Sequence, residues 1–299
     1  MKKYLTTGLK IVVSAVLVGY VVSSVDIIKV IEISRNIQYS YIFLAVLLLI
    51  INYFFSALRW FYLNLDGKIS FIYMLKLYFI GTFFNNFLPT SIGGDGYKIY
   101  KLGQKLGSTT HAFTATFLER FIGMLTLILL SVYGFFVFSS NDILFMLLSI
   151  FGLILSFIVF LIYYPKFTFK PPKLQKLFGI LDKIHDSFKR YYKFPKILAI
   201  SFGLSFLVQF ASIFSQYFIF KSIGITIPMD FSLFAFPLIF ISGYAIPSLN
   251  GIGSQDFLYT TFFQQVGVLA EFAVSASIFY HILRLGVSLI GGFLYVNEK

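Results

Sequence analysis

Long apolar segments are the feature that most constrains the fold of this chain. Six stretches reach about 20 residues, the length that an α-helix needs to cross the hydrocarbon core of a bilayer. They lie near residues 5–24, 40–63, 110–137, 143–164, 196–221 and 268–294. Because backbone groups inside a bilayer must be hydrogen-bonded internally, only helices and closed barrels span it. We therefore expect an all-α polytopic membrane protein in which residues 1–299 form a single transmembrane domain.

The composition supports this assignment and limits the other classes. Hydrophobic residues make up 58% of the chain, the mean hydropathy is +0.86, and only 12% of residues are charged. The net charge of +12 lies in loops, so we attribute it to cytoplasmic loops near anionic lipid headgroups and expect no nucleic-acid partner. The absence of cysteine excludes disulfides, thiolate metal sites and cysteine nucleophiles.

Two short sequences break apolar segments in the same way. Each consists of an apolar residue, a proline, three further residues and two closely spaced glycines. They read Leu88-Pro89-Thr90-Ser91-Ile92-Gly93-Gly94-Asp95 and Ile246-Pro247-Ser248-Leu249-Asn250-Gly251-Ile252-Gly253. Proline removes a backbone donor and glycine admits left-handed geometry, so a helix should be interrupted at both places. Paired breaks in corresponding halves of a membrane protein point to the binding site of a transporter.

The basic residues predict how the two broken segments, 71–88 and 231–247, enter the membrane. Lysines near the N-terminus and the basic loop 165–196 should both be cytoplasmic, which requires an even number of crossings between them. The first broken segment is then re-entrant or spans twice, and the second enters from the opposite face. This predicts an inverted repeat with halves at about 40–137 and 196–294. The alternative is chance similarity between two apolar sequences.

The same rule predicts a multi-pass protein of the cell inner membrane with both termini in the cytoplasm. Within the basic loop, apolar residues of 165–195 recur at helical spacing opposite lysines and aspartates. We interpret this segment as an amphipathic helix on the cytoplasmic membrane surface. The alternative is a short helix that packs against the spans.

Ionisable residues inside the predicted spans are few, and each is a functional hypothesis because burying a charge in lipid is costly. Glu119 and Arg120 are adjacent on a helix and cannot face each other, so each needs its own partner. We expect Arg120 and Arg284 to face a central cavity, with Glu119 and Asp95 balancing them when no ligand is bound. The alternative is a buried ion pair that holds the bundle together.

Arg59 and the first glycine pair each allow two interpretations. Arg59 is expected at the cytoplasmic end of the second span, where it either snorkels beside Trp60 or binds a headgroup phosphate. Gly93-Gly94 precedes a helix expected from about Tyr97, whose free N–H groups would attract an anion. Asp95 at this position also fits the role of a helix cap.

Motifs for catalysis are scarce in this chain. The three histidines are scattered, and the sequence contains no HExxH, Walker or GxSxG pattern. We expect no catalytic residue, no cofactor and no metal. A metal site built from Asp95, Glu119 and Asp256 is the alternative. Coupling to ATP is not expected, whereas movement down a gradient and proton coupling through Glu119 both stay open.

The arrangement of these residues resembles the lysylphosphatidylglycerol synthase transmembrane-region family over nearly the whole chain. The resemblance rests on Gly81, Phe83, Asn85, Pro89 and Gly93-Gly94-Asp95, then Glu119-Arg120, then Pro247, Gly251 and Gly253, and extends to Arg59-Trp60 and Gly291-Gly292. It implies movement of a lipid between leaflets. It also suggests Arg59, Asp95, Glu119 and Arg120 as functional positions.

Two departures from that family affect the expectation. Asp256 is the acid nearest to the second break, where the family usually has a glutamate after its glycine-rich turn. The chain also stops at Lys299 without room for a soluble aminoacyl-transfer domain, so we expect no lysylphosphatidylglycerol synthesis.

These observations lead to one functional expectation and two alternatives. We expect a transporter that moves an anionic lipid or lipid-linked phosphate between leaflets. The expected substrate-binding residues are Arg59, Asn85, Pro89, Gly93, Gly94, Asp95, Glu119, Arg120, Pro247, Asn250, Gly251, Gly253 and Arg284. The alternatives are a membrane-embedded transferase or lipid-processing enzyme acting from one leaflet, and a non-catalytic partner of one. The expected partners are anionic membrane lipids, with a homo-oligomer or a partner membrane enzyme also open.

Overall fold

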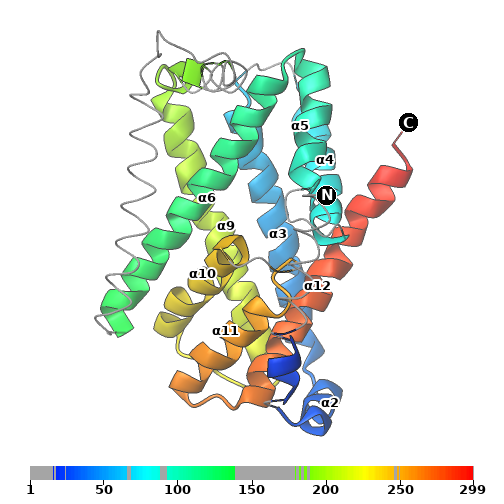
Figure 1. Ribbon diagram of the computed structural model, residues 1–299, viewed down its shortest axis with the longest axis vertical. Coiled ribbons are helices and arrows are strands. Elements are labelled where there is room, and N and C mark those ends of the chain that lie inside the picture. Colours follow the sequence, from blue (N-terminus) through cyan, green and yellow to red (C-terminus); the bar gives the residue numbers. More distant parts are fainter. Residues whose placement is uncertain are drawn as a thin grey trace.

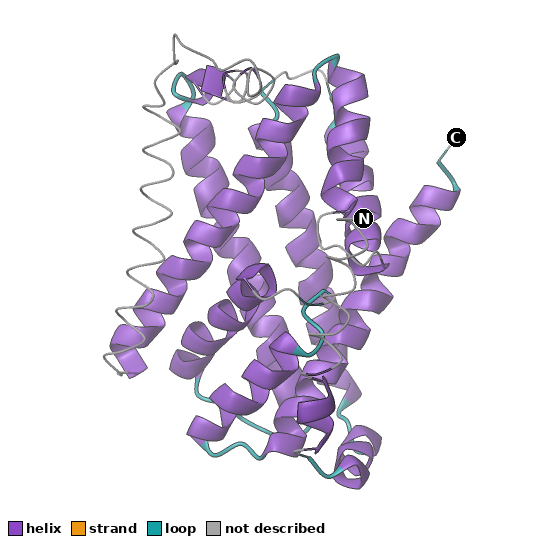
Figure 2. Cartoon of the chain, in the orientation of Figure 1, coloured by secondary structure: helices purple, strands orange, loops and turns teal. Residues whose placement is uncertain are grey.

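The described part of the chain is helical and contains no extended strand (Figures 1 and 2). This computed structural model describes residues 16, 18–23, 25–65, 69–87, 93–138, 179, 182, 185–186, 189–245, 248 and 250–298. The helices are α2 (Ile27–Arg35), α3 (Tyr39–Leu63), α4 (Phe71–Phe87), α5 (Gly93–Leu106), α6 (Thr109–Phe138), α9 (Pro195–Ser222), α10 (Met229–Ala245), α11 (Ser254–Phe263), the 3₁₀ turn η2 (Gln264–Val266) and α12 (Ala270–Val296).

Four of these helices are long and apolar enough to cross a membrane, which makes the chain a multi-pass membrane protein. They are α3, α6, α9 and α12, and they confirm the spans predicted at 40–63, 110–137, 196–221 and 268–294. The predicted span 143–164 lies outside the described residues, and 5–24 is described only at 16 and 18–23.

The two helices that lead into the breaks are shorter, as their sequences predict. Helices α4 and α10 each contain 17 residues. The prolines of the two breaks, Pro89 and Pro247, lie outside the described residues. In Figure 1, α4 and α5 lie towards one end of the molecule, and α10 and α11 lie towards the other.

The helices pack in a reciprocal pattern. Helix α4 packs against α12, α10 packs against α6, and α3 runs along α9. Helix α5 contacts α4 and α6, just as α11 contacts α10 and α12. Exchanging α3–α6 for α9–α12 therefore reproduces the same set of contacts.

Small and polar side chains hold α3 against α9. The Ser215 hydroxyl donates to the Ala45 carbonyl at 3.0 Å, and the Asn52 amide donates to the Val208 carbonyl at 2.8 Å. The hydrophobic effect does not drive helices together inside lipid, because the lipid tails are themselves apolar. Helix association there depends on close packing and on interhelical hydrogen bonds. These two bonds join α3 to α9.

Glycines bring α4 into backbone contact with its neighbours. A Cβ atom on Gly94 would lie 1.7 Å from the Gly81 carbonyl oxygen, and one on Gly291 would lie 1.9 Å from the Phe79 carbonyl oxygen. The first approach seats α5 on α4, and the second seats α12 on α4. Any larger side chain at Gly94 or Gly291 would push these helices apart.

Most of the predicted surface helix 165–195 lies outside the described residues. Its described end packs against the spans. The buried Tyr191 hydroxyl donates to the Leu63 carbonyl at 2.5 Å, and Arg190 Nη1 lies 2.8 Å from His111 Nε2. At this end the segment follows the packed alternative rather than a free surface helix.

Candidate functional site

A chain of buried ion pairs connects α3, α5 and α6. Glu119 accepts from Arg59 Nη2 at 2.5 Å and from Lys98 Nζ at 3.4 Å. Lys98 Nζ also lies 3.0 Å from the Asp95 carboxylate, and Arg120 Nε donates to Asp95 at 2.9 Å. We call Arg59–Glu119–Lys98–Asp95–Arg120 the ion-pair chain. Its charges alternate in sign from one end to the other.

The burial of this chain explains the alternation. Glu119 is 1% exposed and Lys98 is 2% exposed. An ionised group in such surroundings persists only when opposite charges and hydrogen bonds replace its lost hydration. Glu119 and Arg120 take separate partners, as their adjacency predicts. Asp95 balances Arg120, whereas Glu119 balances Arg59 and Lys98.

The snorkelling interpretation of Arg59 and Trp60 is wrong. Both side chains are buried, and Trp60 Nε1 donates to Thr116 Oγ1 at 3.1 Å. Arg59 Nη1 donates to Ser205 at 2.7 Å in addition to pairing with Glu119. Sequence position near a helix end indicated an interfacial residue, but packing of α6 and α9 covers this end of α3.

Lys98 is a site residue that the sequence analysis missed. Its ammonium lies 4.4 Å from the centre of the Tyr78 ring and 5.0 Å from that of Trp60, within the range of cation–π attraction. A signal was available in the sequence. Lys98 follows Asp95 by three residues on one helix, a spacing that brings two side chains together.

The second half contains a related but differently charged cluster. Asp256 accepts from the Gly253 backbone N–H at 2.8 Å and lies 3.1 Å from His281 Nε2, and the Ser277 hydroxyl also donates to it. Asp256 precedes His281 by 25 residues, the same separation as Asp95 and Arg120. By this spacing His281 corresponds to Arg120.

Arg284 differs from the cations of the ion-pair chain. Its Nη2 donates to the Asn250 carbonyl at 2.8 Å and lies 3.3 Å from His281 Nδ1, while its guanidinium sits over the Tyr280 ring. Its Nε is buried without a hydrogen-bond partner. Among the described residues no carboxylate lies within ion-pair distance of Arg284.

The second break supports this arrangement through backbone geometry that glycine permits. Gly251 and Gly253 have φ angles of 87° and 85°, and Asn250 has φ 52°. This turn directs the Asn250 amide to Asn86 on α4, 2.7 Å away. The turn therefore ties the second break to the helix that precedes the first.

The glycine N–H groups do not form the open anion site that the sequence suggested. Helix α5 begins at Gly93 rather than near Tyr97, and the Gly94 N–H donates to Asn85 Oδ1 at 2.8 Å. The Gly253 N–H is bound to Asp256. Neighbouring side chains accept hydrogen bonds from both of these backbone N–H groups. The N–H groups of Gly94 and Gly253 therefore stabilise the local backbone and are not available to a ligand.

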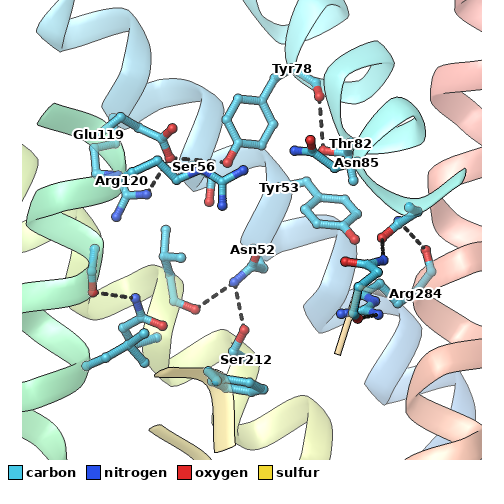
Figure 3. Close-up of a pocket in the computed structure, with 18 of the residues that line it drawn as sticks. Asn52, Tyr53, Ser56, Tyr78, Thr82, Asn85, Glu119, Arg120, Ser212 and Arg284 are labelled. Carbon is cyan, nitrogen blue, oxygen red and sulfur yellow. Dashed lines mark hydrogen bonds and ion pairs between the residues drawn. The ribbon is translucent and has the colours of Figure 1, made fainter. Parts of the chain in front are cut away.

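A cavity of about 230 Å³ lies where the two halves meet. Figure 3 shows Glu119 and Arg120 on one side of it and Arg284 on the other, with Tyr53 between them. Its lining residues are Asn52, Tyr53, Ser56, Arg59, Tyr78, Thr82, Asn85, Asn86, Glu119, Arg120, Gly123, Leu127, Val208, Gln209, Ser212, Phe240, Asn250, Gln255, Tyr280 and Arg284. Arg120 and Arg284 both line it, as predicted, but Glu119 pairs with Arg59 and Lys98 and does not balance either of them.

The predicted site residues fall into three groups. Arg59, Asn85, Glu119, Arg120, Asn250 and Arg284 line the cavity. Gly93, Gly94, Asp95, Gly251 and Gly253 do not line it, and Pro89 and Pro247 lie outside the described residues. The missed lining residues are mostly uncharged and polar. Their signal was the presence of amides such as Asn52 and Gln209 inside apolar spans.

The alternative metal site is not assembled. Asp95 and Glu119 pair with cations, and Asp256 belongs to the separate cluster with His281. Within the described residues no three His, Cys, Asp or Glu side chains converge in a way that would hold a metal ion.

Comparison with known proteins places the chain in a family. Residues 8–292 match the family described as the lysylphosphatidylglycerol synthase TM region. The chain belongs to that family. It is also similar to the UPF0104 membrane protein PH1989 of Pyrococcus horikoshii, with 24% identity over 100% of this chain and 98% of that protein. No solved structure matches it. As a member of the lysylphosphatidylglycerol synthase TM-region family, the chain carries its ion-pair chain and its cavity within the matched residues.

Proposed function

We propose that this protein moves a lipid with an anionic headgroup between the leaflets of the cell inner membrane. The observation that carries the proposal is Arg284, a cation that lines the central cavity with no carboxylate of the described residues within ion-pair distance. A charge buried in a membrane protein is costly unless it is balanced. An anionic headgroup in the cavity supplies the missing charge.

The anion anchor in this proposal is Arg284 rather than Arg120. Two nitrogens of the Arg120 guanidinium already bind the Asp95 carboxylate, at 2.9 and 3.2 Å. The cavity volume of about 230 Å³ is below the roughly 300–1,000 Å³ of sites that enclose a whole drug-sized ligand. It suits a headgroup whose acyl or isoprenoid chains stay in the surrounding lipid.

Alternating access between inverted halves is the mechanism that we propose for this movement. It is supported by the reciprocal helix contacts and by the position of α4–α5 and α10–α11 towards opposite ends of the molecule (Figure 1). Rocking of one half against the other would open the cavity to each leaflet in turn. In this arrangement both termini lie in the cytoplasm. The proposed partners are anionic membrane lipids, and a second copy of this chain or a partner membrane enzyme is a further proposed partner.

Cysteine labelling tests the inverted arrangement. The chain has no native cysteine, and Gln104 on α5 and Gln265 after α11 are both exposed. In cells, a membrane-impermeant thiol reagent is expected to label Gln265→Cys from outside and to reach Gln104→Cys only after the membrane is opened. Labelling of both variants from one side contradicts the inverted repeat.

Lipid movement in reconstituted vesicles tests the function itself. Tail-labelled phosphatidylglycerol is placed in both leaflets, and an impermeant reductant bleaches the outer one. With the protein present, the inner-leaflet fluorescence is also expected to decay, because labelled lipid keeps reaching the outer surface. Protein-free vesicles are the control. A decay that stops at the outer-leaflet fraction in both preparations rejects translocation of this lipid.

A further inference from the structure

Gln255 lines the cavity and carries an unpartnered acceptor. It lies in the first turn of α11, is 5% exposed, and its Oε1 is buried without a hydrogen-bond partner. A Cβ atom on Gly251 would lie 2.5 Å from the Gln255 side-chain carboxamide carbon, so the glycine makes room for the amide. A buried acceptor left unpaired costs free energy, which a donor on a ligand would recover.

Arg284 adds an unpartnered donor to the same cavity. Its Nε is buried and makes no hydrogen bond, while its Nη2 is held by the Asn250 carbonyl. Gln255 and Arg284 both line the cavity. A ligand that satisfies both must therefore present an acceptor, best an anionic one, together with a hydroxyl or amine donor.

The carboxylates near the cavity leave no place for a cationic donor. Every carboxylate oxygen of Asp95, Glu119 and Asp256 already accepts at least one bond from the protein. The partners are Lys98 and Arg120 for Asp95, Arg59, Lys98 and Tyr78 for Glu119, and Ser277, His281 and the Gly253 N–H for Asp256. An ammonium group would enter a region of uncompensated positive charge, which excludes it.

The charge balance also limits the anion. Arg59, Lys98, Arg120 and Arg284 carry four positive charges, and Asp95, Glu119 and Asp256 carry three negative ones, so with His281 left out of the count the net charge of the site is +1. One negative charge neutralises it. A phosphodiester carries one negative charge, whereas a phosphomonoester carries about 1.5 to 2 near neutral pH.

We infer that the cavity selects a lipid whose headgroup joins a single phosphodiester to an uncharged group bearing hydroxyls. The inference rests on the proposed translocation and specifies its substrate class. A phosphate oxygen accepts from Arg284, and a headgroup hydroxyl donates to Gln255. Two sources share this chemistry, a phospholipid with a glycerol headgroup and an isoprenoid lipid with a sugar joined through one phosphate.

The test compares headgroups on the whole protein in vesicles of phosphatidylcholine. The labelled lipids are phosphatidylglycerol, a hexosyl phosphoryl isoprenoid, phosphatidic acid and lysylphosphatidylglycerol. We expect phosphatidylglycerol or the hexosyl lipid to move roughly tenfold faster than phosphatidic acid or the lysyl ester. Phosphatidic acid has no headgroup alcohol and carries more than one negative charge, whereas the lysyl ester brings positive charge into the cavity. Which of the two is faster identifies the source.

A variant of Gln255 links this selectivity to the structure. Gln255→Met keeps the side-chain volume and breaks no hydrogen bond of the described residues. This substitution is expected to lower the translocation rate of the preferred lipid to that of phosphatidic acid. Gln104→Met, on the exposed end of α5, is the matched control and should keep the full preference.

The outcomes separate this inference from the proposed function. Equal rates for all four lipids overturn the inference and leave translocation standing. If none of the lipids moves, the proposed translocation fails. The inference about the headgroup is then decided by how far short-chain forms of the same lipids shift the melting temperature of the protein. Greater stabilisation by the two hydroxylated phosphodiesters supports it, whereas equal shifts overturn it.

Discussion

Replacing Arg284 by glutamine is expected to slow translocation of an anionic lipid by roughly ten- to a hundredfold, because a hydrogen bond to a charged group contributes about 1.5–3 kcal/mol. Glutamine removes the unbalanced charge and the unpaired Nε donor. The fold should tolerate the change, since no carboxylate of the described residues loses a partner. Initial rates in the vesicle assay and melting temperatures in detergent measure the two effects.

Two comparisons make this result specific. Arg284→Lys keeps the charge without the planar donor set and is expected to retain part of the activity. Lys29→Gln removes a cation whose side chain is 60% exposed and that pairs at 3.7 Å with Glu271, so it should leave the rate unchanged. Arg284 is not the anion anchor if its glutamine variant transports at the wild-type rate while folding normally.

Replacing Glu119 by glutamine is expected to lower the free energy of unfolding by about 3–5 kcal/mol, the usual cost of removing one partner from a buried ion pair. Lys98 would keep Asp95 as a partner at 3.0 Å. Arg59 would keep only the neutral Ser205 hydroxyl and would become a buried charge without compensation. Unfolding in detergent, followed by a spectroscopic probe of helix content, measures the loss.

The charge argument predicts how this loss can be reversed. Arg59→Gln combined with Glu119→Gln removes both charges of the pair and should recover much of the stability, which a double-mutant cycle quantifies. Glu271→Gln is the matched control, because it breaks a pair with the exposed Lys29 and should cost at most about 1 kcal/mol. Equal losses for Glu119→Gln and Glu271→Gln would show that burial of the ion-pair chain does not govern its strength.

These two predictions assign different roles to charges that the sequence presents alike. The ion-pair chain fixes the broken helix α5 against α3 and α6, which is the structural alternative raised for Glu119 and Arg120. Arg284 fits the ligand-binding alternative instead. Both interpretations therefore apply, each to a different set of residues.

The sequence by itself determined the class of fold and four of the long spans. Apolar length and the need to satisfy backbone groups in lipid leave little choice, so the predicted spans match α3, α6, α9 and α12. Local geometry also decided that Glu119 and Arg120 point to different partners, because adjacent residues diverge around a helix.

Only the tertiary structure decided which charges are paired. Arg59 meets Glu119 across 60 residues of chain and Ser205 across 146, and His281 rather than Arg284 takes the acid of the second half. Spacing along one helix predicts contacts within a turn or two. Contacts between helices depend instead on how closely their backbones approach, which glycines such as Gly94 and Gly291 set. That packing left Arg284 Nε and Gln255 Oε1 without hydrogen-bond partners, and in our proposal these two atoms give the cavity its selectivity.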